Sequence, residues 1–253
     1  MHQRIMRGMA HSMLFALVWS ALAILAMPHA AYAQLGRLHE PIQELFLGRT
    51  VYTEEQEELQ CTLSPRFLRQ SDAKGWGLNL DLEYGITNRL ELGIDVSHLA
   101  DALSVNIPDP DLRKMGAEVS YLLMEGSEPF AMKVSAEIGV PLGSGTNKSM
   151  RWEPSIVLAK TFGQNQLHLS LAGEFGGNEA EFEYFASVLM PAGRWTPVFE
   201  AGGRISDELY SFYFSPGVYY SVGDGLECGL GIPIGLTASS DRYRIIMNVT
   251  IEF

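Results

Sequence analysis

His168 and Ser170 are the residues of this sequence whose types and spacing come nearest to a catalytic pair. They stand two residues apart in the segment QLHLSLAGEF. A general base beside a hydroxyl nucleophile is what ester hydrolysis requires. Leu167, Leu169 and Leu171 alternate with the pair, so on a β-strand His168 and Ser170 would share the polar face. Ester hydrolysis is therefore the chemistry to be tested against the rest of the sequence.

The spacing is similar to the His-x-Ser pattern of outer-membrane phospholipases. In this chain, however, the serine is followed by Leu-Ala-Gly, and the Asn-Gly that supplies the oxyanion side in that family is missing. A phospholipase must also present its pair to lipid, whereas the alternation here turns the pair toward a lumen. We predict that His168 and Ser170 line a lumen and that the protein is not an enzyme.

The segment IPDPDL brings Asp109 and Asp111 into one loop, with Asp101 nearby. Such a group suggests calcium, but it has no glycine-centred ligand spacing and no bidentate glutamate. We interpret the segment as a polar turn. The sequence therefore leads us to expect no metal and no cofactor.

Strict alternation of apolar and polar residues defines the elements that carry these side chains. Every second residue is apolar from Trp76 to Tyr84, and again from Leu90 to Val96. A period of two indicates strands with one face in an apolar environment, which is either a second sheet or lipid. The pattern recurs to the last residue in twelve runs: 59–67, 76–84, 90–96, 115–123, 130–140, 152–162, 167–175, 182–190, 195–205, 212–222, 226–236 and 243–253.

The fold class that follows is all-β, an antiparallel up-and-down transmembrane β-barrel of about 12 strands within a range of 10–14. Each run is close to the 9–11 residues that a tilted strand needs to cross a bilayer. The range allows for five prolines inside the runs, which should mark bulges or strand ends. They are Pro65, Pro154, Pro197, Pro216 and Pro233.

The N-terminus predicts export from the cytoplasm. Arg4 and Arg7 precede the apolar stretch SMLFALVWSALAILAM, and PHAAYA supplies a breaker and small residues before Gln34. We predict a cleaved secretory signal peptide over residues 1–33, because the apolar stretch is short for an uncleaved anchor. Residues 34–54 would then form a periplasmic N-terminal segment ahead of a barrel over residues 55–253. A short plug tucked into the lumen is the alternative for residues 34–54.

The connections and the aromatic residues favour lipid over a second sheet. Tight connections such as GITN and PAGR alternate with variable ones such as ADALSVNIPDPDL, and this rim asymmetry is typical of outer-membrane barrels. An even strand count puts both termini at the periplasmic rim. Aromatic girdles are expected at both ends of the apolar band. The candidates are Trp76, Tyr84, Trp152, Trp195, Tyr243 and Phe253.

The expected location is the bacterial outer membrane, with its lipids as partners. A terminal aromatic residue on an amphipathic last strand resembles the assembly signal of bacterial outer-membrane proteins, so we expect the barrel-assembly machinery to act through the strand that ends at Phe253. The formal net charge of −12 argues against nucleic acid as a partner. Just two cysteines, Cys61 and Cys228, exclude a disulfide-rich scaffold.

If the apolar faces contact lipid, the alternate residues line the lumen. The charges there either pair into a packed network or line a wet pore. Surplus carboxylates are costly to bury dry, so we favour a conducting lumen that prefers cations or neutral solutes. The candidate selectivity residues are Asp81, Glu83, Glu91, Asp95, Glu118, Glu137, Arg66, Arg89, Lys133, Arg204 and Arg244.

The stretches ELQCTLSPRFL and LDLEYGITNRLELGIDV resemble a family of outer-membrane channels named for the meta-pathway of phenol degradation. The likeness is strongest over residues 40–97, where EYGITNRLELG (Glu83–Gly93) matches the family's first periplasmic hairpin. The resemblance implies import of small, often aromatic, solutes. Our first hypothesis is therefore a porin-like passive channel or transporter. The alternatives are a non-conducting structural or adhesive barrel and, third, an outer-membrane lipid hydrolase.

Overall fold

The computed structural model describes residues 40–69, 74–97, 114–124, 130–142, 149–176, 179–206, 209–223 and 225–253. The predicted signal peptide over residues 1–33 and the predicted polar turn at Asp109 and Asp111 lie outside these ranges. Within the described ranges, no helix is long and apolar enough to cross a membrane.

The twelve alternating runs all form strands. The described strand segments are β1 (Leu59–Arg69), β2 (Lys74–Thr87), β3 (Leu90–Val96), β4 (Lys114–Met124), β5 (Phe130–Pro141), β6 (Arg151–Phe162), β7 (Asn165–Gly176), β8 (Glu179–Leu189), β9 (Trp195–Ser206), β10 (Tyr210–Gly223), β11 (Leu226–Gly231), β12 (Ile234–Gly235) and β13 (Tyr243–Glu252).

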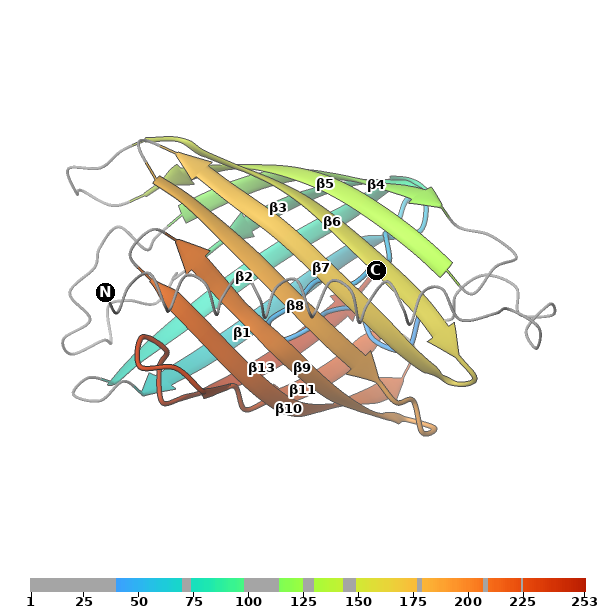
Figure 1. Cartoon of the computed structure of the whole chain (residues 1–253). Coiled ribbons are helices and arrows are strands. Elements are labelled where there is room, and N and C mark those ends of the chain that lie inside the picture. Colours follow the sequence, from blue (N-terminus) through green and yellow to red (C-terminus); the bar gives the residue numbers. More distant parts are fainter. Residues whose placement is uncertain are drawn as a thin grey trace.

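These segments close into a single barrel. Neighbours pair antiparallel in chain order from β1 to β11, and β1 pairs with β13 to close the sheet (Figure 1). The short β12, like β11, lies between β10 and β13, so the two are parts of one barrel strand. The barrel therefore has twelve strands, and the predicted fold class is confirmed.

Side chains alternate between two environments along each strand. On β3, Leu92 and Ile94 are 46% and 52% exposed, whereas the neighbouring Glu91 is 3% exposed. On β1, the polar Gln60 and Thr62 are likewise buried inside the barrel. The outer face thus carries large apolar side chains and the inner face carries polar ones. A lipid bilayer is the environment that makes such an inverted arrangement stable.

Three of the five prolines inside strands coincide with interruptions of the hydrogen-bonded ladders. Pro65 pairs with Leu78 of β2, but the ladder between β1 and β13 skips residues 64 and 65. Pro154 pairs with Ala136 of β5, and the ladder between β6 and β7 skips residues 153 and 154. Pro233 separates β11 from β12. Proline has no N–H to donate. At Pro65 and Pro154 one ladder is interrupted and the other continues, whereas at Pro233 both neighbouring ladders skip residues 232 and 233. The register on either side of each gap is unchanged.

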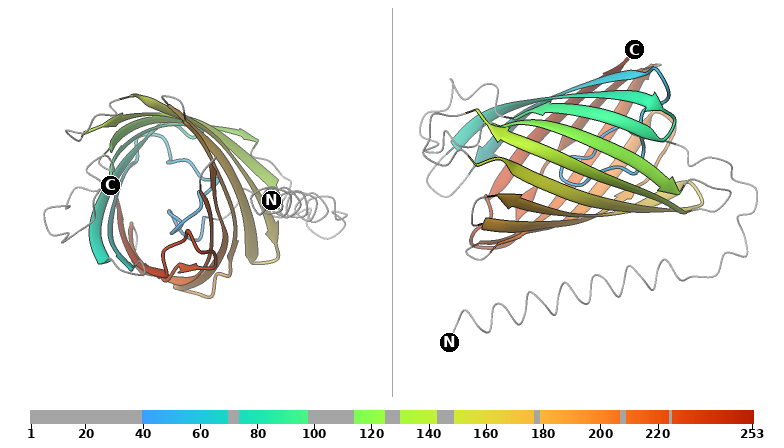
Figure 2. Two further views of the ribbon diagram at one scale, coloured as in Figure 1. Left: turned by 60° about the vertical axis from the view of Figure 1, so that its left-hand side comes forward. Right: turned by 90° about the horizontal axis from the view of Figure 1, so that it is seen from above.

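Residues 40–54 run through the inside of the barrel, and residues 55–58, of which the first three are exposed, connect them to β1 (Figure 2). We call residues 40–58 the plug segment. This placement corrects the expected periplasmic tail over residues 34–54, because its described part lies in the lumen. The reason is apolar content: Ile42, Leu45, Phe46 and Val51 are each at most 5% exposed. These side chains leave water only where the segment lies against the inner wall.

Candidate functional site: the lumen and the plug segment

Phe46 anchors one half of the plug segment. Its ring stacks on Tyr219 of β10, with the ring centroids 4.5 Å apart. A Cβ atom at Gly217 or Gly231 would come within 2.3 or 2.5 Å of the Phe46 ring. These two wall positions therefore admit the ring because they carry no side chain. The buried apolar cluster around Phe46 also contains Ile42, Leu45, Leu189, Val198 and Ile246.

A buried carboxylate holds the backbone of the plug segment beside this anchor. Glu200 of β9 is 0% exposed, and its two oxygens accept the backbone N–H groups of Phe46, Leu47 and Gly48. The donor–acceptor distances are 3.2, 3.1 and 2.8 Å. A carboxylate can accept several hydrogen bonds because it offers about four lone-pair sites. We call this set of three bonds the Glu200 latch.

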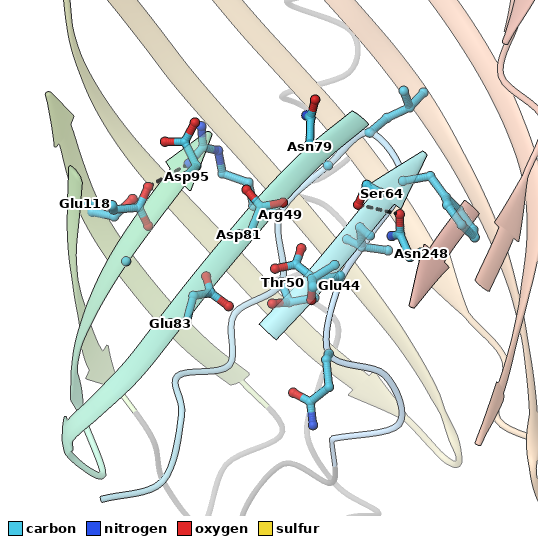
Figure 3. Close-up of a pocket in the computed structure, with 18 of the residues that line it drawn as sticks. Glu44, Arg49, Thr50, Ser64, Asn79, Asp81, Glu83, Asp95, Glu118 and Asn248 are labelled. Carbon is cyan, nitrogen blue, oxygen red and sulfur yellow. Dashed lines mark hydrogen bonds and ion pairs between the residues drawn. The ribbon is translucent and has the colours of Figure 1, made fainter. Parts of the chain in front are cut away.

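Arg49 ties the middle of the plug segment to another part of the wall. Its guanidinium donates to Glu118 of β4 at 3.0 Å and forms an ion pair with Glu153 of β6. One cation thus offsets two inward carboxylates, each of which would be costly to bury unpaired. Figure 3 shows Arg49 and Glu118 joined across the space beside β2.

The hairpin motif EYGITNRLELG (Glu83–Gly93) binds the last part of the plug segment. Glu91 accepts the backbone N–H of Glu54 at 2.9 Å. Asn88 Oδ1, in the turn of the hairpin, accepts the backbone N–H of Gln56, also at 2.9 Å. The sequence predicts a structural hairpin here, and the structure adds that the hairpin is a docking surface for the chain's own N-terminal segment.

Gly85 is the point at which the plug segment passes very close to the wall. The Gly85 N–H donates to the carbonyl of Glu58 at 3.0 Å, and the Gly85 carbonyl accepts the N–H of Glu57 at 2.8 Å. A Cβ atom at position 85 would lie 1.8 Å from the carbonyl oxygen of Glu55. This oxygen belongs to the backbone and cannot swing aside, so the close approach requires glycine.

We expect Gly85→Ala to push this part of the plug segment away from the wall. The measurement is maleimide labelling of a cysteine placed at Thr53, which is 6% exposed, with Cys61 and Cys228 replaced. Labelling should be at least about tenfold faster, since that factor corresponds to only about 1.4 kcal/mol of lost docking. Gly93→Ala is the matched control, because a Cβ atom there meets nothing closer than 3.5 Å. Equal labelling rates in the two variants would contradict the docking role of Gly85.

A polar cavity of about 270 Å³ remains beside the plug segment. Figure 3 shows Asn79, Asp81 and Glu83 along the inner face of β2, with Asp95 and Glu118 on the strands that follow. Ten of the candidate selectivity residues contribute to the lining: Asp81, Glu83, Glu91, Asp95, Glu118, Glu137, Arg66, Lys133, Arg204 and Arg244.

Arg89 is the exception among these candidates. It lies with Asn88 in the turn between β2 and β3, and its side chain is exposed. Thr87 Oγ1 accepts the backbone N–H groups of both Arg89 and Leu90, which closes the turn at this point. The prediction that Arg89 lines the lumen is therefore wrong. The strand begins at Leu90, so Arg89 belongs to the turn that precedes the alternating run.

The cavity has a surplus of negative charge. Its lining includes ten carboxylates and six basic side chains. Several of the bases are already engaged by wall carboxylates. Lys114 pairs with Glu137 at 2.7 Å, and Arg204 pairs with Glu183 at 2.6 Å. A mobile ion in this cavity would therefore meet a field that favours cations.

The candidate hydrolytic pair lies inside the barrel beneath the plug segment. His168 and Ser170 are 1% and 5% exposed. The Tyr52 ring of the plug segment packs edge-on against the His168 ring, and the Tyr52 hydroxyl lies 3.5 Å from His168 Nε2. Gln166 Oε1 lies 3.1 Å from the same nitrogen. His168 thus contacts polar groups of the interior. Both residues are turned away from the apolar outer face, whereas lipid hydrolysis would require them to face lipid.

The six candidate girdle residues are on the outer face, with exposures between 39% and 74%. Trp76 lies near one end of β2 beside Phe67, with their ring centroids 5.0 Å apart. Trp152 lies near one end of β6 and stacks on Phe175 at the same distance. Tyr84, Trp195, Tyr243 and Phe253 are also exposed. Their positions near strand ends suit amphipathic rings at a membrane interface, and that contact stays a prediction.

Glu91 and Glu118, which also hold the plug segment, are among the sequence-based candidates, but Glu200 and Arg49 are not. Glu200 alternates like any other inward carboxylate, so nothing in its local pattern distinguishes it. Arg49 lies in a segment without periodicity. The one usable signal is the apolar content of PIQELF, which is unusual for a tail in water.

The fold and the interior together define a class of protein. A closed antiparallel barrel with an apolar outer face and charged side chains inside has the architecture of outer-membrane porins and channels. Among solved structures, the chain is similar to the KdgM porin, with a TM-score of 0.56, 12% identity and coverage of 76% of this chain and 99% of that one.

Two further solved structures agree with this class. The NanC porin has a TM-score of 0.55 and 9% identity, covering 76% of this chain and 98% of its own. An outer membrane channel from Pseudomonas putida F1 has a TM-score of 0.54 and 11% identity, covering 80% and 98%. At these identities the likeness shows the fold. No protein-family model and no curated protein matches the sequence.

Proposed function

We propose that the protein is an outer-membrane channel for small polar solutes, with a lumen narrowed by the plug segment. The polar cavity beside that segment is the observation that carries the proposal. A barrel with a purely structural role can be filled by its own side chains, as eight-stranded barrels are. Surplus carboxylates in a dry interior are costly, so a hydrated path is the favourable state. The likeness to porins and to an outer-membrane channel supports the same function.

The chemistry of the lining bears on the class of solute. Its negative surplus favours small cations and neutral polar molecules over anions. The sequence resemblance to the phenol meta-pathway family adds small aromatic solutes as candidates. Phe185 and Tyr213 also line the cavity, and their rings would offer stacking partners to such a solute.

The sequence-based predictions also indicate how the protein would be exported, assembled and oriented in the membrane. The predicted signal peptide would direct the chain across the inner membrane, and the strand ending at Phe253 would engage the barrel-assembly machinery. The tight turns and both termini would then face the periplasm. In this orientation the plug segment enters the lumen from the periplasmic rim.

The proposal predicts cation-selective conductance that depends on the acidic wall. Asp81 and Asp95 are directly opposite each other on β2 and β3, and both line the cavity. In planar bilayers, the refolded mature protein should show discrete steps with a reversal potential on the cation side. The Asp81→Asn, Asp95→Asn double variant should lower the cation-to-anion permeability ratio roughly twofold or more, because two wall charges are removed.

Asn79→Ala is the matched control for this experiment, since Asn79 lines the same cavity from the same strand and carries no charge. It should leave the permeability ratio unchanged. Silent recordings from correctly folded protein would overturn the channel proposal. A structural barrel, closed by the Glu200 latch and the Phe46 anchor, would then become the leading function.

A further inference from the structure

Three carboxylates meet where the plug segment docks on the hairpin. Glu54 of the plug segment, Glu83 of β2 and Glu91 of β3 each bring one oxygen into a group whose members all lie within 4.8 Å of one another. Glu54 and Glu91 are 6% and 3% exposed. Like charges this close and this well buried repel each other strongly unless a counter-charge lies between them.

Gln60 of β1 adds an independent sign that a ligand belongs at this junction. Its side chain is 1% exposed, and its Nε2 donates to Glu83 Oε2 at 2.6 Å. The oxygen of the same amide, Oε1, is buried and has no hydrogen-bond partner. Because this amide is directed at Glu83, an electron-rich oxygen without a donor stands at the edge of the carboxylate group. A buried oxygen in that state is costly unless something positive contacts it.

The basic side chains nearby do not balance the group. Lys133 of β5 is the cation that faces Glu83 and Glu91, and its Nζ already donates to the carbonyl oxygen of Tyr52 at 2.7 Å. One ammonium supplies a single positive charge against three carboxylates.

We propose that Glu54, Glu83, Glu91 and the Gln60 amide oxygen form a calcium site that fastens the plug segment to the barrel wall. Ca²⁺ binds carboxylate and amide oxygens at 2.3–2.6 Å, so two oxygens on one ion lie at most about 5 Å apart. The 4.8 Å spacing of the carboxylate oxygens satisfies this limit. An all-oxygen donor set selects Ca²⁺ over Zn²⁺, which prefers nitrogen and sulfur ligands.

The position of the site gives the ion a mechanical consequence. The carboxylate of Glu54 belongs to the plug segment, whereas Glu83 and Glu91 belong to the wall. The ion would therefore cross-link the two immediately beside Gly85, where the backbone of residues 54–55 presses on β2. This inference goes beyond the proposed channel function, and it departs from the sequence-based expectation of no metal.

The test is calorimetric titration of CaCl₂ into the folded mature protein in detergent after treatment with EDTA. One ion per chain is expected, bound at least about tenfold more weakly in Glu54→Gln because a carboxylate ligand is lost. Glu91→Gln should weaken binding similarly. Glu174→Gln is the matched control, since Glu174 is an inward carboxylate of β7 that pairs with Arg151 and Lys114.

Folding of each variant is checked by the heat-dependent shift of the barrel on gels. Two results would overturn the calcium site: absence of binding to the folded wild type, or affinities of Glu54→Gln and Glu91→Gln within about twofold of it. The titration does not measure conduction. Failure of the calcium site would therefore leave the channel proposal standing, and silent bilayers would leave the calcium site standing.

Discussion

Deletion of residues 40–54 should raise single-channel conductance at least about threefold, because a barrel of twelve strands is wider than its own side chains can fill. The plug segment contacts both sides of the lumen: Phe46 packs on β10, and Arg49 reaches β4 and β6. Removing residues 40–54 opens the narrow space beside them to the full cross-section of the barrel. The measurement is conductance of the refolded protein in planar bilayers at one salt concentration.

Deletion of residues 34–39 is the matched control, because it shortens the mature chain and leaves the plug segment intact. It should conduct like the whole protein. If both deletions gave the same conductance, the plug segment would not be the element that narrows the path. The two deletions therefore separate an effect of the plug segment from an effect of a shorter N-terminus.

Glu200→Leu should release the backbone of the plug segment. The leucine removes the acceptor of three buried N–H groups, from Phe46, Leu47 and Gly48. Leaving a buried donor unsatisfied costs about 1–3 kcal/mol, so three donors represent about 3 kcal/mol or more. Hydrogen exchange over residues 42–50, followed by mass spectrometry, should then lose protection by roughly 100-fold or more, at tenfold per 1.4 kcal/mol.

Glu200→Gln is the graded control, because its amide keeps one oxygen that can accept hydrogen bonds. It should lose less protection than Glu200→Leu. Ser187→Ala removes only the 3.4 Å hydrogen bond to Glu200 and should change exchange little. Unchanged protection in Glu200→Leu would show that the apolar cluster around Phe46 holds the segment without the latch.

The barrel itself could be predicted because it follows from a local pattern, the alternation of apolar and polar residues along each strand. Each run of alternating residues, such as 76–84 or 90–96, predicts which side chains face outward, and this prediction needs no other part of the chain. Even the interruption of the eleventh run at Pro233 could be anticipated, since a proline cannot donate to the ladder. The inward phase of His168 and Ser170 followed from the same rule.

The plug segment could not be predicted with the same rule, because its position depends on distant residues. Gly48 and Glu200 are 152 positions apart, and no local pattern links them. PIQELF also lacks the length that would identify a helix or strand. Arg89 was misplaced for a related reason, because Thr87 closes a turn where alternation alone continues a strand.

The docking role of the hairpin motif shows what a resemblance can and cannot provide. EYGITNRLELG could be assigned to a hairpin from its turn residues. The structure adds that Gly85, Asn88 and Glu91 bind the plug segment, which the motif alone does not indicate.

The plug segment also constrains the order of assembly. It precedes β1, and the pairing of β1 with β13, the last strand, is what closes the barrel. The segment is thus synthesised first, yet the Glu200 latch can form only after β9 has been made. Contacts of such long sequence separation are slow to form. If the seam closed early, residues 40–58 would have to thread in through an open rim. That step would be avoided if the sheet curled around a segment already resting on the first hairpin, and the plug segment would then be enclosed as the barrel closed.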